Sequence, residues 1–485
     1  MRQSSLPLED LHVWAHFNDV QLLETSIEPH IIREDGTDKG GGLLAKGEHG
    51  QGKPLVAVPR ELVLSKERIE QYAKADQSLK ELIEAAALLV QNPRTAVLLF
   101  LVYQMTINSP SSPSHGLGFN NPFAGYVKML PHSIPLPTFY TAEERELLVG
   151  TSLSDAVSQK LISLEREFDN LKAATAKIPW CQEIWWSESA DCLTLEDWKL
   201  ADAMYRSRAL ELPQSRGVGM VPIIDMANHA SDDRYNARFE VDEDSGSVLL
   251  VVRDDRHIPK GDEITIMYGC GGACEMLFSY GFLEEHANSA REIFLNLSIP
   301  SDDPLRLAKI QFAQAAPGVR IYVDDSNQVQ WESTFVWWAC INEEDGLDFR
   351  VEQTIDGDTE LKASWKGQAL ATDTLLQSVL LADHLRDIFV LRATVTIQER
   401  IEDQGSRLAE CEEQYDNTDC SDQVRHSVYG AIGKLRSLEM ELLTRAYETL
   451  EGEKSQLLKS SIVRDYLAQG NCSTESPNNT PDDFS

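Results

Sequence analysis

The chain has 485 residues and a formal net charge of −34, with 42% apolar and 25% charged residues. This length is too great for one core and predicts two or three domains, in a composition that is normal for globular proteins. The strong negative charge argues against a nucleic-acid-binding surface, because phosphates would be repelled. It favours a basic partner, although a net acidity that only aids solubility explains the charge equally well.

The N-terminus and the apolar segments show no sign of secretion or of membrane insertion. The first five residues lead into Glu9 and Asp10 rather than into an apolar run, so no signal peptide is expected. The most apolar segment, residues 85–103, is interrupted by Gln91-Asn92-Pro93-Arg94, which predicts core helices and no membrane span. We therefore expect no contact with membranes and a cytoplasmic and/or nuclear location.

The eight cysteines are scattered without a disulfide framework, which is typical of a reducing compartment. Cys270 and Cys274 have the spacing of one helical turn, but no second cysteine pair or histidine cluster accompanies them. Ordinary thiols are therefore favoured over a zinc site, and no metal is expected.

The first 60 residues predict one helix and two strands. The helix is expected near residues 8–23, and residues 54–59 read as a short buried strand between prolines. Gly40-Gly41-Gly42 stands just before another apolar run. Glycines there allow the backbone to come close to a ligand or to another strand, although a glycine cluster alone is more often a flexible turn.

Residues 65–199 have the period and the punctuation of helices. Capping signals predict the helix starts, and one long amphipathic helix is expected near residues 153–174. The starts are marked by Ser65, Asn92-Pro93, the capping box of Thr141 and Glu144, and Thr194-Leu195-Glu196-Asp197.

The strand period returns after residue 217. Residues 239–241 and 248–252 flank Asp244-Ser245-Gly246 and predict a hairpin. A further strand is expected at residues 264–267, entering a Tyr268-Gly269 turn, and a short helix follows at residues 273–279. Strands on both sides of a helical block indicate an α+β fold with a helical insertion.

The C-terminal part is expected to be all helical apart from a brief strand-like stretch at residues 293–299. The clearest helices are predicted at residues 375–402 and 424–450, joined by a polar loop at residues 411–420. The domains we expect are residues 1–64 (N-terminal helix and first β segment), 65–204 (helical insertion), 205–287 (second β segment, with the site), 288–469 (helical domain) and 470–485 (disordered tail).

Several motifs occur in one order through residues 30–285. They are Gly40-Gly41-Gly42-Leu43-Leu44-Ala45, Pro122-Phe123, Ser207-Arg208-Ala209, Asp225-Met226-Ala227-Asn228-His229, Gly261-Asp262-Glu263-Ile264, Tyr268-Gly269 and Tyr280-Gly281-Phe282-Leu283-Glu284. Together they resemble the SET-domain protein-lysine methyltransferases of the Rubisco large subunit methyltransferase class. The resemblance implies the SET β-fold, with a pseudoknot that brings Asn228-His229 beside Tyr268, and a C-terminal substrate-binding domain.

The resemblance also implies S-adenosyl-L-methionine as cofactor and a role for each matching residue. Tyr268 would be catalytic, and Tyr268 and Phe239 would contact the substrate lysine. The residues that would hold or enclose the cofactor are Gly40, Gly41, Arg208, Asp225, Asn228, His229, Tyr280, Gly281 and Phe282. Read without the family, Tyr268 is a strand-end core aromatic, Asn228-His229 a capping or surface pair, and Arg208 a helix-surface ion-pair partner.

Three positions depart from the family pattern, and two of them bear on the substrate. Lys39 stands where an acidic residue is common, Ala273 where an asparagine is common, and Phe239 where the Rubisco enzyme has a tyrosine. The last two leave open the identity of the substrate and the number of methyl groups transferred.

The function expected from the resemblance is methylation of a lysine in a non-histone protein, such as a ribosomal protein or translation factor. The substrate is expected to be basic, and the enzyme a monomer without direct nucleic-acid contact. Two alternatives remain: protein-histidine methylation, since an imidazole needs less deprotonation near neutral pH, and a non-catalytic SET-fold binding module.

Overall fold

The computed structural model describes the chain in eleven stretches. They are residues 5–32, 38–110, 118, 121–187, 192–213, 217–231, 234–269, 271–353, 359–371, 376–411 and 424–472. The chain divides into two compact units, each with its own core. The first comprises Met1–Tyr140, Val157–Cys270 and Phe278–Gly281, and the second comprises Thr141–Ala156, Gly271–Leu277 and Phe282–Ser485.

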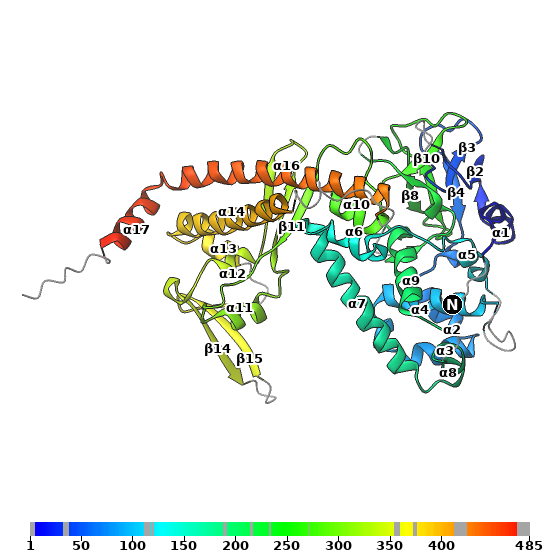
Figure 1. Cartoon of the computed structure of the whole chain (residues 1–485), viewed down its shortest axis with the longest axis horizontal. Coiled ribbons are helices and arrows are strands. Elements are labelled where there is room, and N and C mark those ends of the chain that lie inside the picture. Colours follow the sequence, from blue (N-terminus) through cyan, green and yellow to red (C-terminus); the bar gives the residue numbers. More distant parts are fainter. Residues whose placement is uncertain are drawn as a thin grey trace, which may run out of the picture. The chain divides into compact units, whose positions relative to one another are not determined.

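Two four-stranded sheets form the β part of the first unit (Figure 1). One has the order β1-β4-β9-β8, and the other has the order β2-β3-β10-β7. The bounds are β1 Gln21–Leu22, β2 Thr25–Glu28, β3 Gly42–Ala45, β4 Pro54–Val58, β7 Asn228–His229, β8 Ala237–Val241, β9 Val248–Val252 and β10 Glu263–Ile266. The predicted hairpin is confirmed as the antiparallel pair β8–β9, and the buried strand of residues 54–59 is confirmed as β4.

A short ribbon, β5 (Ala209–Glu211) with β6 (Val218–Met220), completes the strands described in this unit. The predicted N-terminal helix is shorter than expected: α1 spans Leu11–Phe17. Asp19 lies two residues later with φ 57°, a left-handed conformation that ends helices, and the chain turns directly into β1.

The helices of the first unit come mainly from the predicted insertion. They are α2 Lys66–Ala73, α3 Gln77–Ala85, α4 Pro93–Ile107, α5 Phe123–Met129, most of α7 Ser152–Thr175, α8 Pro179–Ile184 and α9 Leu195–Arg208. The predicted caps are confirmed, since Ser65, Asn92 and Thr194 each accept a hydrogen bond from the first turn of a helix. α4 is buried along nearly its whole length, which explains why its sequence is apolar on every face.

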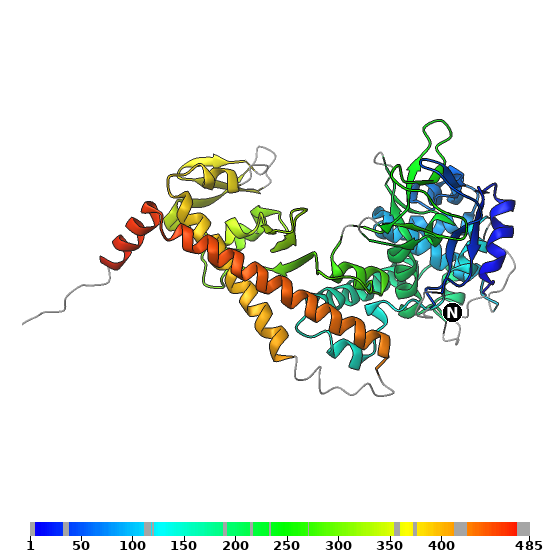
Figure 2. The same ribbon diagram turned by 90° about the horizontal axis from the view of Figure 1, so that it is seen from above.

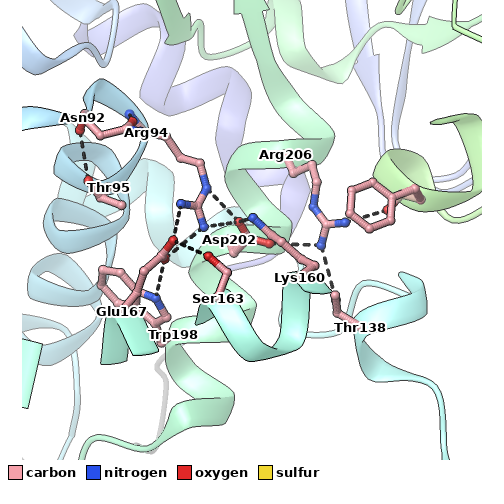
Figure 3. Close-up of polar contacts among 11 residues, drawn as sticks. Asn92, Arg94, Thr95, Thr138, Lys160, Ser163, Glu167, Trp198, Asp202 and Arg206 are labelled. Atoms are coloured by element: carbon pink, nitrogen blue, oxygen red, sulfur yellow. Dashed lines mark hydrogen bonds and ion pairs between the residues drawn. The ribbon is translucent and has the colours of Figure 1, made fainter. Parts of the chain in front are cut away.

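A charge cluster joins α4, α7 and α9 inside the first unit (Figure 3). Asp202 on α9 has no exposed side-chain area and forms ion pairs with Arg94 at 2.7 Å, Lys160 at 2.9 Å and Arg206 at 3.0 Å. Arg94 also forms an ion pair with Glu167 on α7, with 2.9 Å between Arg94 Nη1 and Glu167 Oε1. Burial by itself would raise the pKa of Asp202, but the three cations together hold that pKa below its usual value.

The second unit is helical in its described residues from Leu376 onward, but it also contains two three-stranded sheets. The sheets are β11-β12-β13 and β14-β15-β16, with bounds β11 Glu292–Asn296, β12 Gly318–Val323, β13 Val329–Glu332, β14 Leu347–Gln353, β15 Thr359–Trp365 and β16 Gln368–Leu370. The prediction of an all-helical region after residue 288 is therefore wrong for β12 to β16, between residues 318 and 370, whereas the strand-like stretch predicted at residues 293–299 corresponds to β11. β14 is mostly exposed, but Leu347, Phe349 and Val351 alternate with polar residues, so its sequence contains a strand pattern that the helical prediction overlooked.

The helices of this unit include a long pair, α14 (Arg386–Glu410) and α16 (His426–Leu457), which lie side by side (Figures 1 and 2). The others are α6 Ala142–Glu146, most of α10 Ala273–Tyr280, α11 Arg306–Ala313, α12 Val336–Ala339, α13 Leu376–Leu381 and α17 Ser461–Cys472. The predicted polar loop at residues 411–420 lies, beyond Cys411, outside the described residues, as does the predicted tail beyond Cys472. Within the described helices, none has the length and apolar character needed to span a membrane.

Polar side chains of α16 bind the loop around residue 150 within the second unit. Arg436 donates to the carbonyls of Val149 at 2.8 Å and Leu408 at 2.7 Å. Glu439 accepts hydrogen bonds from the backbone amide and the hydroxyl of Ser152. Burial raises the pKa of Glu439 to about 7, and these two donors oppose that rise only in part.

The raised pKa of Glu439 predicts a pH-dependent stability. Between pH 4.5 and 7 the folded state binds more protons than the unfolded state, so the free energy of unfolding falls as the pH rises through this window. The loss attributable to Glu439 is about 3 kcal/mol, and it is complete above pH 7. Relative to wild type, Glu439→Gln should therefore gain stability from pH 5 to pH 8 in urea unfolding. A difference between the two proteins that does not change with pH would contradict this prediction.

Candidate active site

The site is built where three distant segments share one sheet of the first unit. β10 pairs antiparallel with β3, and on its other side it pairs parallel with β7, with Thr265 opposite Asn228 and Ile266 opposite His229. Since Tyr268 follows two residues after β10, the parallel register carries it to the end of β7. The expectation that Asn228-His229 lies beside Tyr268 is thereby confirmed.

The approach to β7 contains a strained residue. Ile223 has φ 74° and is fully buried, and a β-branched side chain in the left-handed region costs about 1–3 kcal/mol. It begins the 3₁₀ turn Ile224–Met226, which carries Asp225 and leads into Asn228. Such strain persists only where the surroundings hold the backbone in place, and it tends to gather at functional sites.

Tyr268 is fixed by its hydroxyl, its backbone and its ring. The hydroxyl donates to the carbonyl of Ala227 at 2.9 Å, and the backbone amide donates to His229 Nδ1 at 3.1 Å. The ring lies 4.6 Å from that of Tyr280 and 5.2 Å from that of His229, between centroids. The Tyr280 hydroxyl donates to the Tyr268 carbonyl at 3.3 Å.

The surroundings determine where the protons lie on the Tyr268 phenol and the His229 imidazole. Burial raises the pKa of Tyr268 above its usual value, with nearby Arg208 opposing this rise and Tyr280 adding to it. The phenol is therefore neutral at physiological pH and acts as a donor to Ala227, while its oxygen keeps the capacity to accept. His229 Nδ1 accepts a hydrogen bond, so the proton of the neutral imidazole is on Nε2.

The side chain of Asn228 connects the start of β10 with the backbone just before β3. Its Nδ2 donates to the carbonyl of Gly41 at 3.2 Å and to Glu263 Oε1 at 2.8 Å. The second carboxylate oxygen of Glu263 accepts from Lys39 Nζ at 2.5 Å. Lys39 and Glu263 were not among the residues predicted to form the site. The available signal was a carboxylate at the start of an otherwise apolar strand.

The three glycines at positions 40–42 are required for two different reasons. A Cβ on Gly41 would lie 2.5 Å from Leu8 Cδ2, and one on Gly42 would lie 2.8 Å from Asn228 Nδ2. These two glycines therefore permit close packing within the protein. Gly40 has φ +82°, and no atom of a described residue lies within 4 Å of where its Cβ would be. Only Gly40 has the open surroundings that a backbone cradle for a ligand requires.

Arg208, at the C-terminal end of α9, is held against the turn before β7. Its Nη1 donates to the carbonyl of Asp225 at 3.0 Å and lies 3.4 Å from the Asp225 carboxylate. Tyr126 on α5 donates to the same carboxylate at 2.5 Å. Burial raises the pKa of Asp225, and Arg208 opposes this rise.

Two atoms of this group remain unsatisfied. Arg208 Nε and Asp225 Oδ1 are buried and have no hydrogen-bond partner among the described residues. A buried cationic donor without a partner is costly, and a ligand carboxylate would satisfy it. The arrangement around Arg208 therefore fits a cofactor with an amino-acid end.

The remaining predicted residues lie at different distances from this cluster. Tyr280 ends α10 beside Tyr268, and Gly281 has φ +81°, with Pro135 O only 2.8 Å from where its Cβ would be. Phe239 lies on β8, partly buried against the core. Phe282 is partly buried and begins the long C-terminal segment of the second unit.

Within the described part of the chain, no group of three or more histidine, cysteine or acidic side chains has the arrangement of a metal site. Cys274 is described, and burial raises the pKa of its thiol to about 12, so the thiol is protonated at neutral pH. Cys270, its partner in the alternative zinc pair, lies outside the described residues.

No protein-family model matches the chain. SET domain-containing protein 8 of Schizosaccharomyces pombe is 28% identical over 438 residues, which cover 88% of this chain and 92% of that protein. N-lysine methyltransferase setd6 of Danio rerio is 26% identical over 302 residues, 59% of each chain. The chloroplastic Rubisco large subunit N-methyltransferase of Nicotiana tabacum is 22% identical over 322 residues, 64% of this chain and 57% of that protein.

Comparison with solved structures identifies the fold. The SET domain of LSMT bound to MeLysine and AdoHcy superposes with a TM-score of 0.65 and 17% identity, over 98% of each chain. Rubisco LSMT bound to AdoMet gives a TM-score of 0.64 and 16% identity, also over 98% of each chain. The chain thus has the SET fold of the Rubisco large subunit methyltransferase class, and it is a homologue of SET-domain protein-lysine N-methyltransferases.

Proposed function

We propose that this protein is an S-adenosyl-L-methionine-dependent protein-lysine N-methyltransferase acting on a non-histone protein. The observation that carries the proposal is the contact set of Tyr268 with Ala227 and His229, formed where β7 and β10 pair in parallel. A strained turn, a neutral buried phenol and an unsatisfied arginine donor gather there, in a chain with the fold of a known methyltransferase class.

The chemistry assigns distinct tasks to these residues. When bound, S-adenosyl-L-methionine supplies an electrophilic methyl group on a sulfonium. Arg208 would bind the carboxylate of that cofactor, Asn228 and His229 its amino-acid end, and Gly40 would cradle it, while Gly41 packs within the protein. Tyr280, Gly281 and Asp225 would complete the enclosure, the last by holding Arg208 in place.

Tyr268 would act at the reacting centre by position and polarity. Its neutral oxygen accepts weak CH···O contacts, about 0.5–1 kcal/mol each, from a methyl group polarised by positive sulfur. It cannot serve as the base, because burial raises its pKa and leaves it protonated. The substrate lysine, with a free pKa of about 10.4, would lose its proton to solvent on entering the aromatic surroundings. Alignment of the attacking nitrogen with the methyl carbon and sulfur would supply much of the acceleration.

The charge of the chain supports a basic substrate protein. A formal charge of −34 attracts cationic surfaces and speeds their encounter with the enzyme. We expect a monomer working in the cytoplasm or nucleus on a partner such as a ribosomal protein or translation factor. Phe239 would contact the substrate lysine without the hydroxyl of the tyrosine found there in the Rubisco enzyme. This difference bears on how many methyl groups are added.

The experiment is transfer of label from S-adenosyl-L-[methyl-³H]methionine to proteins of fractionated cell extract, with the labelled residue mapped by mass spectrometry. The expected result is label on lysine of a basic, non-histone protein. Label on histidine would replace the lysine assignment. Failure to bind the cofactor in calorimetry would overturn the proposal and leave a binding module as the function.

A further inference from the structure

The amide of Asn228 has only one orientation that its partners allow. Gly41 O and Glu263 Oε1 are both acceptors, and both lie within hydrogen-bond distance of Asn228 Nδ2, at 3.2 and 2.8 Å. A carbonyl cannot donate, and neither can an ionised carboxylate, so the two amide hydrogens are used inside the protein. The oxygen Oδ1 is then the atom that Asn228 can offer to a ligand.

Glu263 enforces this orientation because it is itself held by Lys39. Lys39 Nζ bonds to Glu263 Oε2, which leaves Oε1 for Asn228. Both side chains of the ion pair are largely buried, with 25% and 17% of their side-chain areas exposed. The ion pair crosses 224 positions of sequence and links the residue before the glycine turn to β10. Lys39 is also the position at which this chain departs from the acidic residue common in the family.

We propose that Glu263 is a positioning residue which, with Lys39 as its counter-charge, directs Asn228 Oδ1 toward the ammonium of the cofactor's amino-acid end. This inference rests on the proposed function, because it takes the cofactor to be S-adenosyl-L-methionine. The ammonium is the group of choice, since it has three donors and no acceptor. Its place follows from Arg208, whose guanidinium would hold the neighbouring carboxylate and is bonded to Asp225, three residues before Asn228.

Substitution of Glu263 by glutamine tests whether the ion pair sets the orientation of the Asn228 amide. Lys39 can only donate, so it requires the Oε1 of the new glutamine, and Nε2 then faces Asn228. The asparagine must rotate its amide to accept from Nε2, which withdraws Oδ1 and presents Nδ2 to the ligand. If Lys39 is also removed, the glutamine is free to offer its oxygen to Asn228, and the original orientation returns.

The measurement is the affinity of the purified protein for S-adenosylhomocysteine and two truncated analogues in calorimetry. One analogue lacks the carboxylate and keeps the amine; the other lacks the amine and keeps the carboxylate. Glu263→Gln should weaken S-adenosylhomocysteine and the amine-bearing analogue by about tenfold, roughly the value of one charge-assisted hydrogen bond. It should leave the deaminated analogue unaffected.

The double variant Lys39→Met with Glu263→Gln should recover most of the lost affinity, whereas Lys39→Arg should bind as wild type does. Glu352→Gln, which alters an exposed ion pair with Lys362, is the matched control and should change nothing. An equal loss for all three ligands, or no rescue by Lys39→Met, would overturn the inference and leave Glu263 with a structural role only. Unchanged affinity in Glu263→Gln would overturn it as well. Absence of binding by the wild type would instead refute the proposed function.

Discussion

Replacement of Tyr268 by phenylalanine should reduce methyl transfer by about 100- to 1,000-fold, the usual effect of removing one preorganised polar group from a reacting centre. The substitution keeps the ring, and with it the packing against Tyr280 and His229. It removes the oxygen and the hydrogen bond to the buried carbonyl of Ala227. The loss should therefore lie in the rate at saturating cofactor, with the affinity for S-adenosylhomocysteine changed by less than about threefold.

The matched control is Tyr72→Phe, in the same unit but outside the site. Tyr72 is partly buried, and its ring packs against Phe100 and Phe123 at centroid distances of 6.3 and 5.8 Å. Losing its hydroxyl should leave labelling unaltered. If Tyr268→Phe kept more than a tenth of wild-type labelling, the phenolic oxygen would have no direct part in the reaction.

Replacement of Asp202 by alanine should destabilise the first unit by about 3–5 kcal/mol, as expected when one partner is removed from a buried ion pair. Three cations, Arg94, Lys160 and Arg206, would then lie together with Glu167 as the only carboxylate of the cluster (Figure 3). All three cations have most of their side-chain area buried, so water can screen their repulsion only weakly.

The measurement is urea unfolding followed by circular dichroism, at a pH near 7, where Asp202 is ionised. Asp254→Ala is the control, because Asp254 pairs with Arg238 on the surface with 79% of its side chain exposed, and such pairs contribute little. A change below about 1 kcal/mol for Asp202→Ala would mean that Lys160 gives up its proton or that water enters the cluster. Burial does lower the pKa of Lys160, so this outcome has a physical route.

The sequence was most informative where local chemistry decides the structure. The capping box of Thr194 and Asp197 forms as expected, as does the box of Thr141 and Glu144, because each is completed within four residues. The hairpin β8–β9 follows from an alternating apolar pattern in β8 and a continuous apolar run in β9, on either side of a turn rich in polar residues and glycine. The ordered motifs were sufficient to identify the fold.

The same reasoning failed in two strands whose residues are mostly exposed. β13 (Val329, Trp331) and β14 (Leu347, Phe349, Val351) do alternate apolar with polar residues, but only Leu347 among them is buried, and the all-helical prediction overlooked this period of two. Their stability comes from pairing with neighbours such as β15, a property of the sheet rather than of the segment.

The sequence by itself determined the SET fold, the kind of reaction to expect, and Tyr268 with Asn228-His229 as the group to examine. Only the tertiary structure decided how that group is held. The parallel pairing of β7 with β10, the contact of Lys39 with Glu263 across 224 positions, and the single permitted orientation of Asn228 all arise between distant segments. Local periodicity cannot encode such contacts, because each depends on the register of several strands forming together.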